Sequence, residues 1–267
     1  MPGAWHLVFV CAAIVADSAD DRNAPAAIGH RIVRTFGGIG RPHRHQEPGT
    51  LYHLTARGVG RRDIFVDDSD RAAFLAVIAA AGRHAGWSCQ AYCLMSNHYH
   101  LLVEAGPGRL SQPMHAINQA LARRFNDREQ RWGHLFGERF HSQPVVDPPH
   151  HPEVVRYIVL NPVAAGICGR PAAWPWSSYR AAAGLEEPHP CLDGRRALDA
   201  FDGNRAAFCR YVSERLDLSP LERVLRPGTE SALVLANRVL GYSQSEIAST
   251  LGTSQATVSR RLSRARE

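Results

Sequence analysis

The stretch SCQAYCLMSNHYHLLVE, residues 88–104, contains two strand-like runs on either side of a tight Ser96-Asn97 turn. The runs Ser88–Met95 and His98–Glu104 are rich in apolar and aromatic residues, as paired strands are. A short polar turn between two such runs indicates a β-hairpin. We therefore expect this hairpin to form part of an antiparallel sheet.

His98 and His100 fall on one face of the second strand, because successive side chains of a strand alternate. Tyr99 then points to the other face, together with Leu101 and Val103. Two imidazoles on one rigid strand face can bind a divalent ion and leave positions open for substrate oxygens. The alternative is that both are ordinary sheet histidines.

Apolar periodicity predicts further elements around the hairpin. We expect a strand over 51–56, a helix from N-caps at 67–69 to about Gly86, a helix over Leu110–Asp127, a strand or extended loop within 133–146, and a short helix from Pro152 to Asn161-Pro162. This order of strands and helices predicts an α+β fold built on an antiparallel sheet.

Tyr157 and Asn161 lie four residues apart on the last of these helices, so they project from one face. An amide oxygen at Asn161 can complete a metal site or orient a phosphate, with Tyr157 beside the metal as a nucleophile. A tyrosine has a pKa of about 10, so it needs a nearby positive charge to react at neutral pH. The alternative is that Tyr157 packs with Val154 and Ile158 in a helix–sheet core.

Composition narrows the classes of function. The chain has 267 residues, 45% of them hydrophobic, and a formal charge of +6. It contains no lysine, which excludes a P-loop and a lysine Schiff base. An all-arginine basic set suits contacts with phosphate and guanine, although a GC-rich genome also replaces lysine by arginine. The six cysteines form no C-x-x-C pair, which fits a reducing cytoplasm better than a disulfide framework.

The C-terminal stretch Gln244–Ser263 fits a helix-turn-helix template, with a small residue at Ala248 and a turn at Gly252. The expected second helix, from about Ser254 to Ala265, presents side chains that can reach base edges or phosphates: Gln255, Thr257, Ser259, Arg260, Arg261 and Arg264. The stretch is similar to the promoter-reading helix-turn-helix of sigma factors. The alternative is a plain helical hairpin that serves dimerisation.

Five blocks of the sequence resemble the single-tyrosine HUH transposases, in the version found in REP-associated tyrosine transposases. The first two blocks carry the paired histidines and the tyrosine–asparagine pair. The blocks are 94–103, 157–166, 52–58, 133–136 and 174–179. The blocks occur in the expected order and at plausible spacing, and the similarity runs from about Gly40 to Gly184.

The resemblance implies a ferredoxin-like antiparallel sheet with helices, the HUH nuclease fold. It also implies that His98, His100 and Asn161 hold Mg²⁺ or Mn²⁺. Tyr157 would attack single-stranded DNA at REP-type hairpins, leaving a 5′-phosphotyrosine link that a 3′-OH can reverse. Arginines 57, 123, 124 and 139 are candidates for gripping phosphates, against ordinary surface roles.

Composition, periodicity and the resemblance together suggest how the chain is divided. We expect a poorly ordered leader over 1–38, a catalytic domain over 39–184, a connector over 185–228 and the helix-turn-helix over 229–267. The apolar run Ala4–Ala16 is too short to span a membrane, so we expect a cytoplasmic, nucleoid-associated protein with no membrane partner. One nucleophile per chain implies a homodimer if two strands are exchanged.

Several interpretations stay open. His53 and His134 fall within the resembling blocks but stay outside the metal set: His53 either borders the site or is a hydrogen-bonded strand histidine, and for His134 we favour the structural interpretation. The aromatic residues of 174–179 can stack on bases or seal the edge of a core. The protein could also be a catalytically silent hairpin-binding or transcription-regulating protein, or a metal-dependent hydrolase in which Tyr157 is structural.

Overall fold

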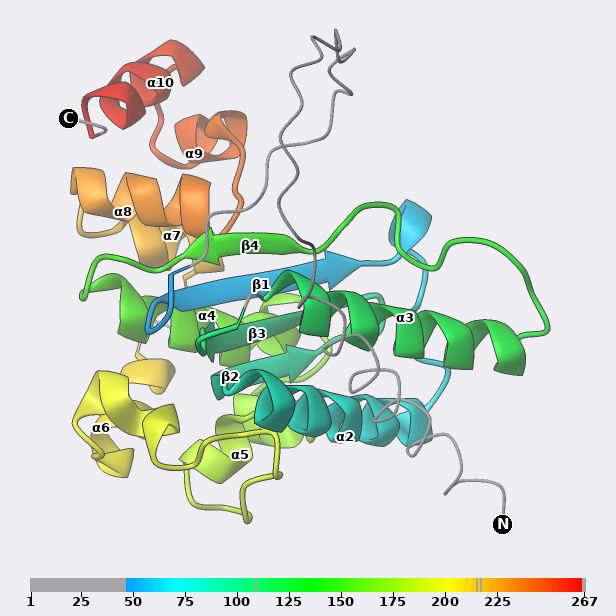
Figure 1. Ribbon diagram of the computed structural model, residues 1–267. Helices are drawn as coiled ribbons and strands as arrows, with labels where there is room; N and C mark the ends of the chain where they lie inside the picture. The colour runs from blue at the N-terminus through cyan, green and yellow to red at the C-terminus, as the bar shows by residue number, and fades with distance from the viewer. Residues whose placement is uncertain (1–46, 109, 215, 217, 266–267) are drawn as a thin grey trace, which may run out of the picture.

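The computed structural model describes residues 47–265 except 109, 215 and 217, so the expected leader over 1–38 lies outside the described residues. A four-stranded antiparallel sheet forms the centre, in the order β2-β3-β1-β4 (Figure 1). The strands are β1 (Leu51–Arg57), β2 (Ser88–Leu94), β3 (His98–Glu104) and β4 (His141–Pro144). The predicted hairpin is the β2-β3 pair, and the predicted α+β class is confirmed.

The register of the sheet decides which side chains meet. Arg57 of β1 lies opposite His98 of β3, and Thr55 lies opposite His100. Paired residues share a face of the sheet, and side chains two apart on a strand do as well. His53 therefore lies on the same face as both histidines of β3.

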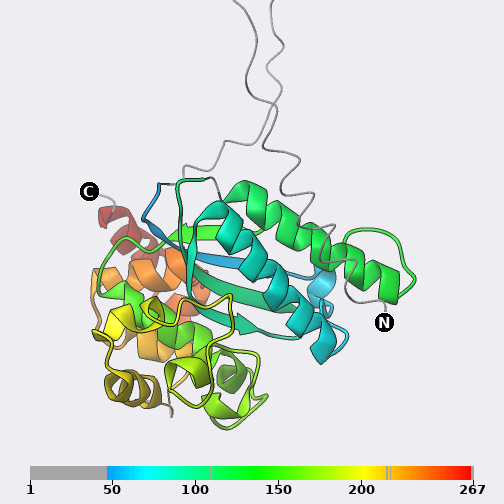
Figure 2. The same ribbon diagram turned by 60° about the horizontal axis from the view of Figure 1, so that its bottom comes forward.

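Helices α2 (Asp68–Ala85) and α3 (Ser111–Arg128) lie side by side and cover the opposite face of the sheet (Figures 1 and 2). Asp67 caps α2, because its side chain accepts hydrogen bonds from backbone N–H groups of the first turn. Gly86 ends this helix with a φ of 66°, a left-handed conformation that glycine adopts without a steric penalty. Both ends of α2 match the sequence expectation.

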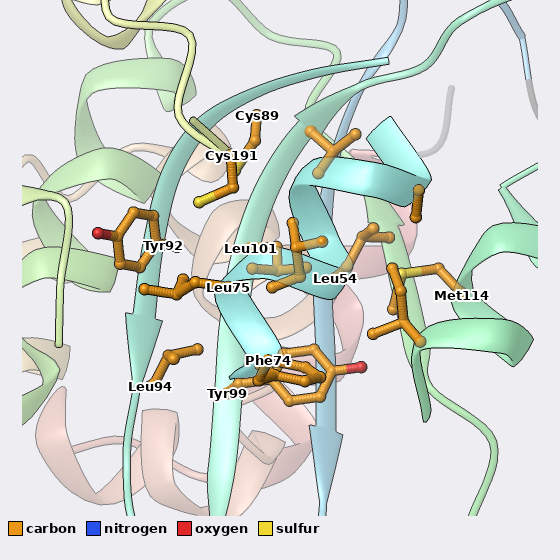
Figure 3. Close-up of a cluster of buried hydrophobic side chains, with 14 of the residues drawn as sticks. Leu54, Phe74, Leu75, Cys89, Tyr92, Leu94, Tyr99, Leu101, Met114 and Cys191 are labelled. Atoms are coloured by element: carbon orange, nitrogen blue, oxygen red, sulfur yellow. The ribbon is translucent and has the colours of Figure 1, made fainter. Parts of the chain in front are cut away.

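Tyr99 lies in the core between the sheet and these two helices (Figure 3). Its ring packs against Phe74 with centroids 5.0 Å apart, and its hydroxyl donates to Asn118 Oδ1 at 2.6 Å. Leu101 and Val103, on the same face of β3, are fully buried beside it. The expected separation of Tyr99 from the two histidines is confirmed.

The remaining helices cover the histidine face of the sheet and extend past both of its edges, at β2 and at β4 (Figures 1 and 2). They are α4 (His150–Ala164), α5 (Tyr179–Ala182), α6 (Arg205–Ser213), α7 (Pro220–Leu225), α8 (Glu230–Val234), a π-helical turn over Leu235–Val239, α9 (Gln244–Thr250) and α10 (Gln255–Arg264), with 3₁₀ turns over Val59–Arg61, Pro171–Ala173 and Arg196–Phe201. Within the described part of the chain, every helix is too short or too polar to cross a membrane.

Helix α4 is longer at both ends than the sequence indicated. It begins at His150 and continues to Ala164, past the expected stop at Asn161-Pro162. Pro162 lies inside the helix and has no N–H to donate to the carbonyl four residues earlier, yet the helix continues for two more residues. The Asn161 carbonyl still accepts from the backbone N–H of Ala165 at 2.9 Å.

The segment after α4 seals the edge of the core. The Trp174 indole N–H donates to the Leu94 carbonyl at 3.2 Å, and Trp176 packs against the hydrophobic core. Tyr179 is buried, with its ring 5.5 Å from that of Phe208. These contacts favour sealing of the core over stacking on bases for all three aromatic residues.

The C-terminal helices share one hydrophobic core with α4. This cluster includes Ile158 and Val159 of α4, Val224 of α7, and Ile247 and Val258 of the helix-turn-helix. A histidine on α4 adds a polar contact, because His150 Nε2 donates to the carbonyl of Ser231 at 2.9 Å. Residues 229–265 are therefore packed directly against the helix that carries Tyr157.

Candidate active site

The ring of His98 is oriented by its neighbour in the hairpin. Asn97 Nδ2 donates to the Arg61 carbonyl at 3.0 Å, which identifies the other amide atom as the oxygen. That oxygen lies 2.6 Å from His98 Nδ1 and accepts its proton. In neutral His98 the lone pair is therefore on Nε2.

The ring of His100 is oriented by a residue of the neighbouring strand. His53 Nε2 lies 2.9 Å from His100 Nδ1, and the two rings stack with centroids 5.1 Å apart. His53 Nδ1 lies 2.9 Å from the carbonyl oxygen of Val239, at the end of the π-helical turn. Both histidines are buried. The C-terminal region thus reaches the sheet at the histidine face.

The site fits a cation by its chemistry. His100 Nε2 is buried and has no hydrogen-bond partner among the described residues. A buried polar nitrogen without a partner is costly unless a ligand fills that role. The described residues contain no cluster of three or more His, Cys, Asp or Glu side chains arranged for a metal. A metal at the two histidines would therefore take further ligands of another type, such as the Asn161 amide, DNA or water.

All three histidines resist protonation. Burial lowers the pKa of His53 to about 4, although the hydrogen bond to Val239 opposes the shift. Burial and the charge of Arg57 lower the pKa of His98 to about 4, against a hydrogen bond with the Asn161 side chain. Burial, followed by the neighbouring histidines, holds the pKa of His100 well below its usual value. Neutral imidazoles at pH 7 are the form that binds metals.

Helix α4 brings Tyr157 to these rings. The Tyr157 ring lies perpendicular to His100, with centroids 5.6 Å apart, and 6.0 Å from the ring of His53. Asn161 lies one turn further on, where its Nδ2 approaches the Tyr157 carbonyl at 3.4 Å and its side chain is close enough to His98 to raise the pKa of that imidazole. The structure therefore brings together Tyr157, His98, His100 and Asn161, the four residues predicted for the catalytic centre.

Tyr242 of the C-terminal region also contacts the predicted nucleophile. Its ring centroid lies 6.2 Å from that of Tyr157. Burial raises the pKa of Tyr157, whereas hydrogen bonds with Asn161 and Tyr242 and the charge of Arg57 oppose this rise. Burial also raises the pKa of Tyr242, and the neighbouring Tyr157 raises it further.

Two cavities meet at Tyr157. One, of about 270 Å³, lies toward α7 and is lined by Asn161 and Tyr242 among others. The other, of about 570 Å³, opens in front of His53 and His100. Four arginines line this larger cavity, namely Arg57, Arg61, Arg139 and Arg238. The sequence predicted Arg57 and Arg139 as phosphate contacts but not the other two.

The neighbouring arginines Arg123 and Arg124 have different surroundings. Arg123 is exposed on α3. Arg124 Nε lies 2.5 Å from Asp70 Oδ1, and its Nη2 donates to Ser69 Oγ at 3.1 Å. Arg124 therefore links α3 to α2 on the face of the sheet opposite the histidines. Neither arginine joins the catalytic group, and their role in DNA binding stays a prediction.

The helix-turn-helix forms much as the sequence predicted. Three of the predicted reading residues on α10 are exposed, namely Gln255, Arg260 and Arg264, while Thr257 and Ser259 are half-buried. Arg261 is also half-buried, and its Nη2 donates to the Gly228 carbonyl at 3.0 Å. The exposed face of α10 thus carries two arginines and a glutamine.

Sequence reasoning missed two groups of the site and left a third open. Neither the Val239 carbonyl nor Tyr242 was considered, and His53 was left open between bordering the site and a structural role. For His53 a signal did exist: pairing Arg57 with His98 places it on the histidine face by strand parity. For Val239 and Tyr242 we find no such signal, because their positions depend on how the C-terminal helices pack.

Two segments of the chain match models of known protein families. Residues 48–161 match the family model described as "Transposase IS200 like". This part of the chain is similar to IS200-like transposases. Residues 227–267 match the model of sigma-70, region 4, and this second match covers the helix-turn-helix.

The solved structures and curated proteins add the following. The structure of a REP-associated tyrosine transposase bound to a REP hairpin is similar to this chain at 19% identity, with a TM-score of 0.46. The similarity covers 57% of this chain and 90% of that chain. No curated protein matches the sequence. The predicted members of the catalytic centre all lie within the stretch that matches the IS200-like model, at the histidine face of the sheet and on α4.

Proposed function

We propose that this protein cleaves and rejoins single-stranded DNA by metal-dependent transesterification, with Tyr157 as the nucleophile. The observation that carries the proposal is the position of the Tyr157 ring, 5.6 Å from His100, whose buried Nε2 has no partner in the described part of the chain. The IS200-like transposase model over residues 48–161 supports it independently.

His98, His100 and Asn161 would hold the divalent ion, Mg²⁺ or Mn²⁺. Two imidazole nitrogens and an amide oxygen form a mixed donor set that several divalent ions accept. When bound, the ion supplies positive charge that polarises the scissile phosphate and stabilises the charge developing there. Asn97 and His53 keep the lone pairs of His98 and His100 on Nε2, the atom left for such a ligand.

Tyr157 would attack the phosphorus of the scissile phosphodiester through its hydroxyl oxygen. The Tyr157 Oη–P bond forms while the bond from phosphorus to the 3′ oxygen breaks. Tyr157 releases a proton to solvent in the cavity, and the leaving 3′ oxygen takes one up. The products are a 5′-phosphotyrosine link and a free 3′-OH, which can attack in reverse and rejoin the strand without ATP.

The DNA strand would enter through the cavity of about 570 Å³ that reaches His100 and Tyr157. Arg57 and Arg139 line this cavity and are exposed, so their guanidinium groups can pair with phosphates along the strand. A REP-type hairpin would present the single strand, and α10 could add contacts with duplex DNA. Exchange of two strands would require two chains, hence a homodimer.

A second candidate function is binding without cleavage, in hairpin recognition or transcription control. The observation that favours it is the exposed face of α10, with Gln255, Arg260 and Arg264, within a match to sigma-70 region 4. Such side chains can read base edges in a major groove.

A denaturing gel with labelled hairpin oligonucleotides and Mn²⁺ tests the proposal. A 3′-labelled oligonucleotide should shift to a protein–DNA adduct, and a 5′-labelled one should give a shorter free product. Both signals should vanish with chelator and in Tyr157→Phe. Native binding without an adduct would favour the binding function. Cleavage that persists in Tyr157→Phe but needs metal would indicate a hydrolase.

A further inference from the structure

A chain of three groups links the C-terminal region to the proposed metal site. It runs from the Val239 carbonyl to His53 Nδ1, and from His53 Nε2 to His100 Nδ1, with 2.9 Å at each step. The two imidazoles are stacked with an angle of 13° between their planes. Both rings are nearly inaccessible to solvent, with 2% of His53 and 5% of His100 exposed.

The positions of the hydrogen atoms between these three groups can be worked out from the Val239 carbonyl. A carbonyl oxygen only accepts, so His53 Nδ1 must carry the proton that is shared with Val239. A neutral His53 then has its lone pair on Nε2. His100 Nδ1 must therefore donate across the 2.9 Å contact. This leaves the lone pair of His100 on Nε2, the buried atom without a partner among the described residues.

The Val239 carbonyl can accept this hydrogen bond from His53 because of its position at the end of a helical turn. Val239 is the last residue of the π-helical turn Leu235–Val239. Carbonyls in the last turn of a helix lack partners within the helix and are completed by side chains or water. Here the partner is a histidine of the central sheet, 186 positions earlier in the sequence.

We propose that His53, held by the Val239 carbonyl, is a positioning residue that sets the tautomer and ring orientation of His100 for metal binding. The segment before the helix-turn-helix is then a structural part of the metal centre as well as a tether for DNA binding. This inference rests on the proposed function, because it takes His100 as a metal ligand. Groups that orient a ligand histidine typically change metal affinity 10–100-fold.

Binding of Mn²⁺ to the full-length chain, measured by calorimetry, tests the proposal. We expect His53→Leu to weaken binding about 10–100-fold, because leucine cannot accept from His100. His53→Gln should bind within about threefold of the unsubstituted protein, since its amide oxygen can accept and its amide N–H can donate. His84→Leu, which changes an exposed histidine on α2, is the matched control and should leave the affinity unchanged.

A second measurement is independent of the metal. Long-range ¹H–¹⁵N spectra of the metal-free protein should report His100 with the proton on Nδ1. In His53→Leu the Nε2–H form of His100 should become populated, and His53→Gln should restore the original form. Thermal unfolding of each variant in chelator separates these effects from a general loss of stability.

Each outcome bears on a particular step. If His100→Ala abolishes Mn²⁺ binding but His53→Leu binds normally, the inference is wrong and the proposed metal site stands. If the unsubstituted chain binds no Mn²⁺, or His100→Ala binds it unchanged, the proposed metal site fails and the inference with it. A His100 spectrum that does not respond to His53→Leu overturns the inference by itself.

Discussion

His98 and His100 stand two positions apart on β3, yet different parts of the molecule hold them. His98 is oriented by Asn97, the adjacent residue. His100 is oriented by His53, 47 positions away, and through it by a carbonyl of the C-terminal region. The first arrangement is complete within one hairpin. The second exists only once β1 has paired with β3 and the C-terminal helices have packed against the sheet.

This difference bears on how the site depends on the rest of the protein. His98 is half-buried, so water can replace a lost partner. His100 is buried, and a lost partner there leaves an unsatisfied group. The comparison therefore predicts that His100 is the more vulnerable of the two to changes far from the site.

Removal of the His98 ring or of the His100 ring should have the largest effect on Mn²⁺ affinity, and the two losses should be similar. Because groups that merely orient a ligand contribute 10–100-fold, His98→Ala and His100→Ala should each lower Mn²⁺ affinity more than about 100-fold. Calorimetry checks this, with His84→Leu as the control. Tight binding that survives in one of the two variants would remove that histidine from the metal site.

Removing the supporting partners should separate the two histidines. Asn97→Ala should lower Mn²⁺ affinity only about fivefold, the equivalent of one net hydrogen bond. His53→Leu should lower it about 10–100-fold, because no water replaces the buried acceptor. Parallel titrations of the two variants decide the matter. Equal losses, or a larger loss in Asn97→Ala, would contradict the contrast between local and long-range support.

Tyr242→Phe sharpens the role of the C-terminal region at the nucleophile. Loss of one neutral hydrogen bond to Tyr157 should slow adduct formation about fivefold and leave Mn²⁺ affinity unchanged. The bond with Tyr242 lowers the pKa of Tyr157, so its removal should move the pH–rate profile to higher pH. A pH profile that stays in place would mean that Tyr242 only packs against the ring.

Arg124→Ala tests whether general destabilisation imitates these effects. The substitution removes a contact to Asp70 on the opposite face of the sheet and should cost about 1 kcal/mol of folding stability. Because the histidine supports are untouched, Mn²⁺ affinity should not change. Arg123→Ala, at the exposed neighbour, is the matched control and should leave stability within about 0.5 kcal/mol. Weaker Mn²⁺ binding in Arg124→Ala would mean that a general loss of stability is enough to lower the affinity.

The smallest expected effect is a loss of folding stability at acidic pH. Burial opposes ionisation of Asp70, but hydrogen bonds from the Val66 N–H and from Arg128 and Arg124 outweigh it, so the pKa of Asp70 is lowered from its ordinary value of 3.8. The folded state then binds fewer protons than the unfolded state near that pH. The stability from this carboxylate should be fully present above about pH 5 and lost as the pH falls through the lowered pKa. Denaturant unfolding from pH 6 to 3 should give a shallower fall for Asp70→Asn.

Much of the site could be predicted because it is encoded locally. Strand alternation is enough to place His98 and His100 on one face, and helical spacing is enough for Tyr157 and Asn161. The cap at Asp67 and the turn at Gly252 are also local signals. Each of these features depends on residues within a few positions of one another.

What could not be predicted depends on packing between distant segments. The Val239 carbonyl reaches His53 only because the C-terminal helices share a core with α4. The extension of α4 past Pro162 was missed because a proline inside a helical pattern usually ends or kinks the helix at the preceding residue. Arg124 was grouped with Arg123 because no local pattern reveals the ion pair with Asp70.

Diffraction from crystals grown with Mn²⁺, collected with its anomalous signal, tests the central claim most directly. The account predicts one strong anomalous peak about 2.1 Å from the Nε2 atoms of both His98 and His100. The Asn161 amide oxygen should complete the protein ligands, with the Tyr157 hydroxyl facing the peak. A peak bound elsewhere, or to Nδ1 of His100, would contradict the account.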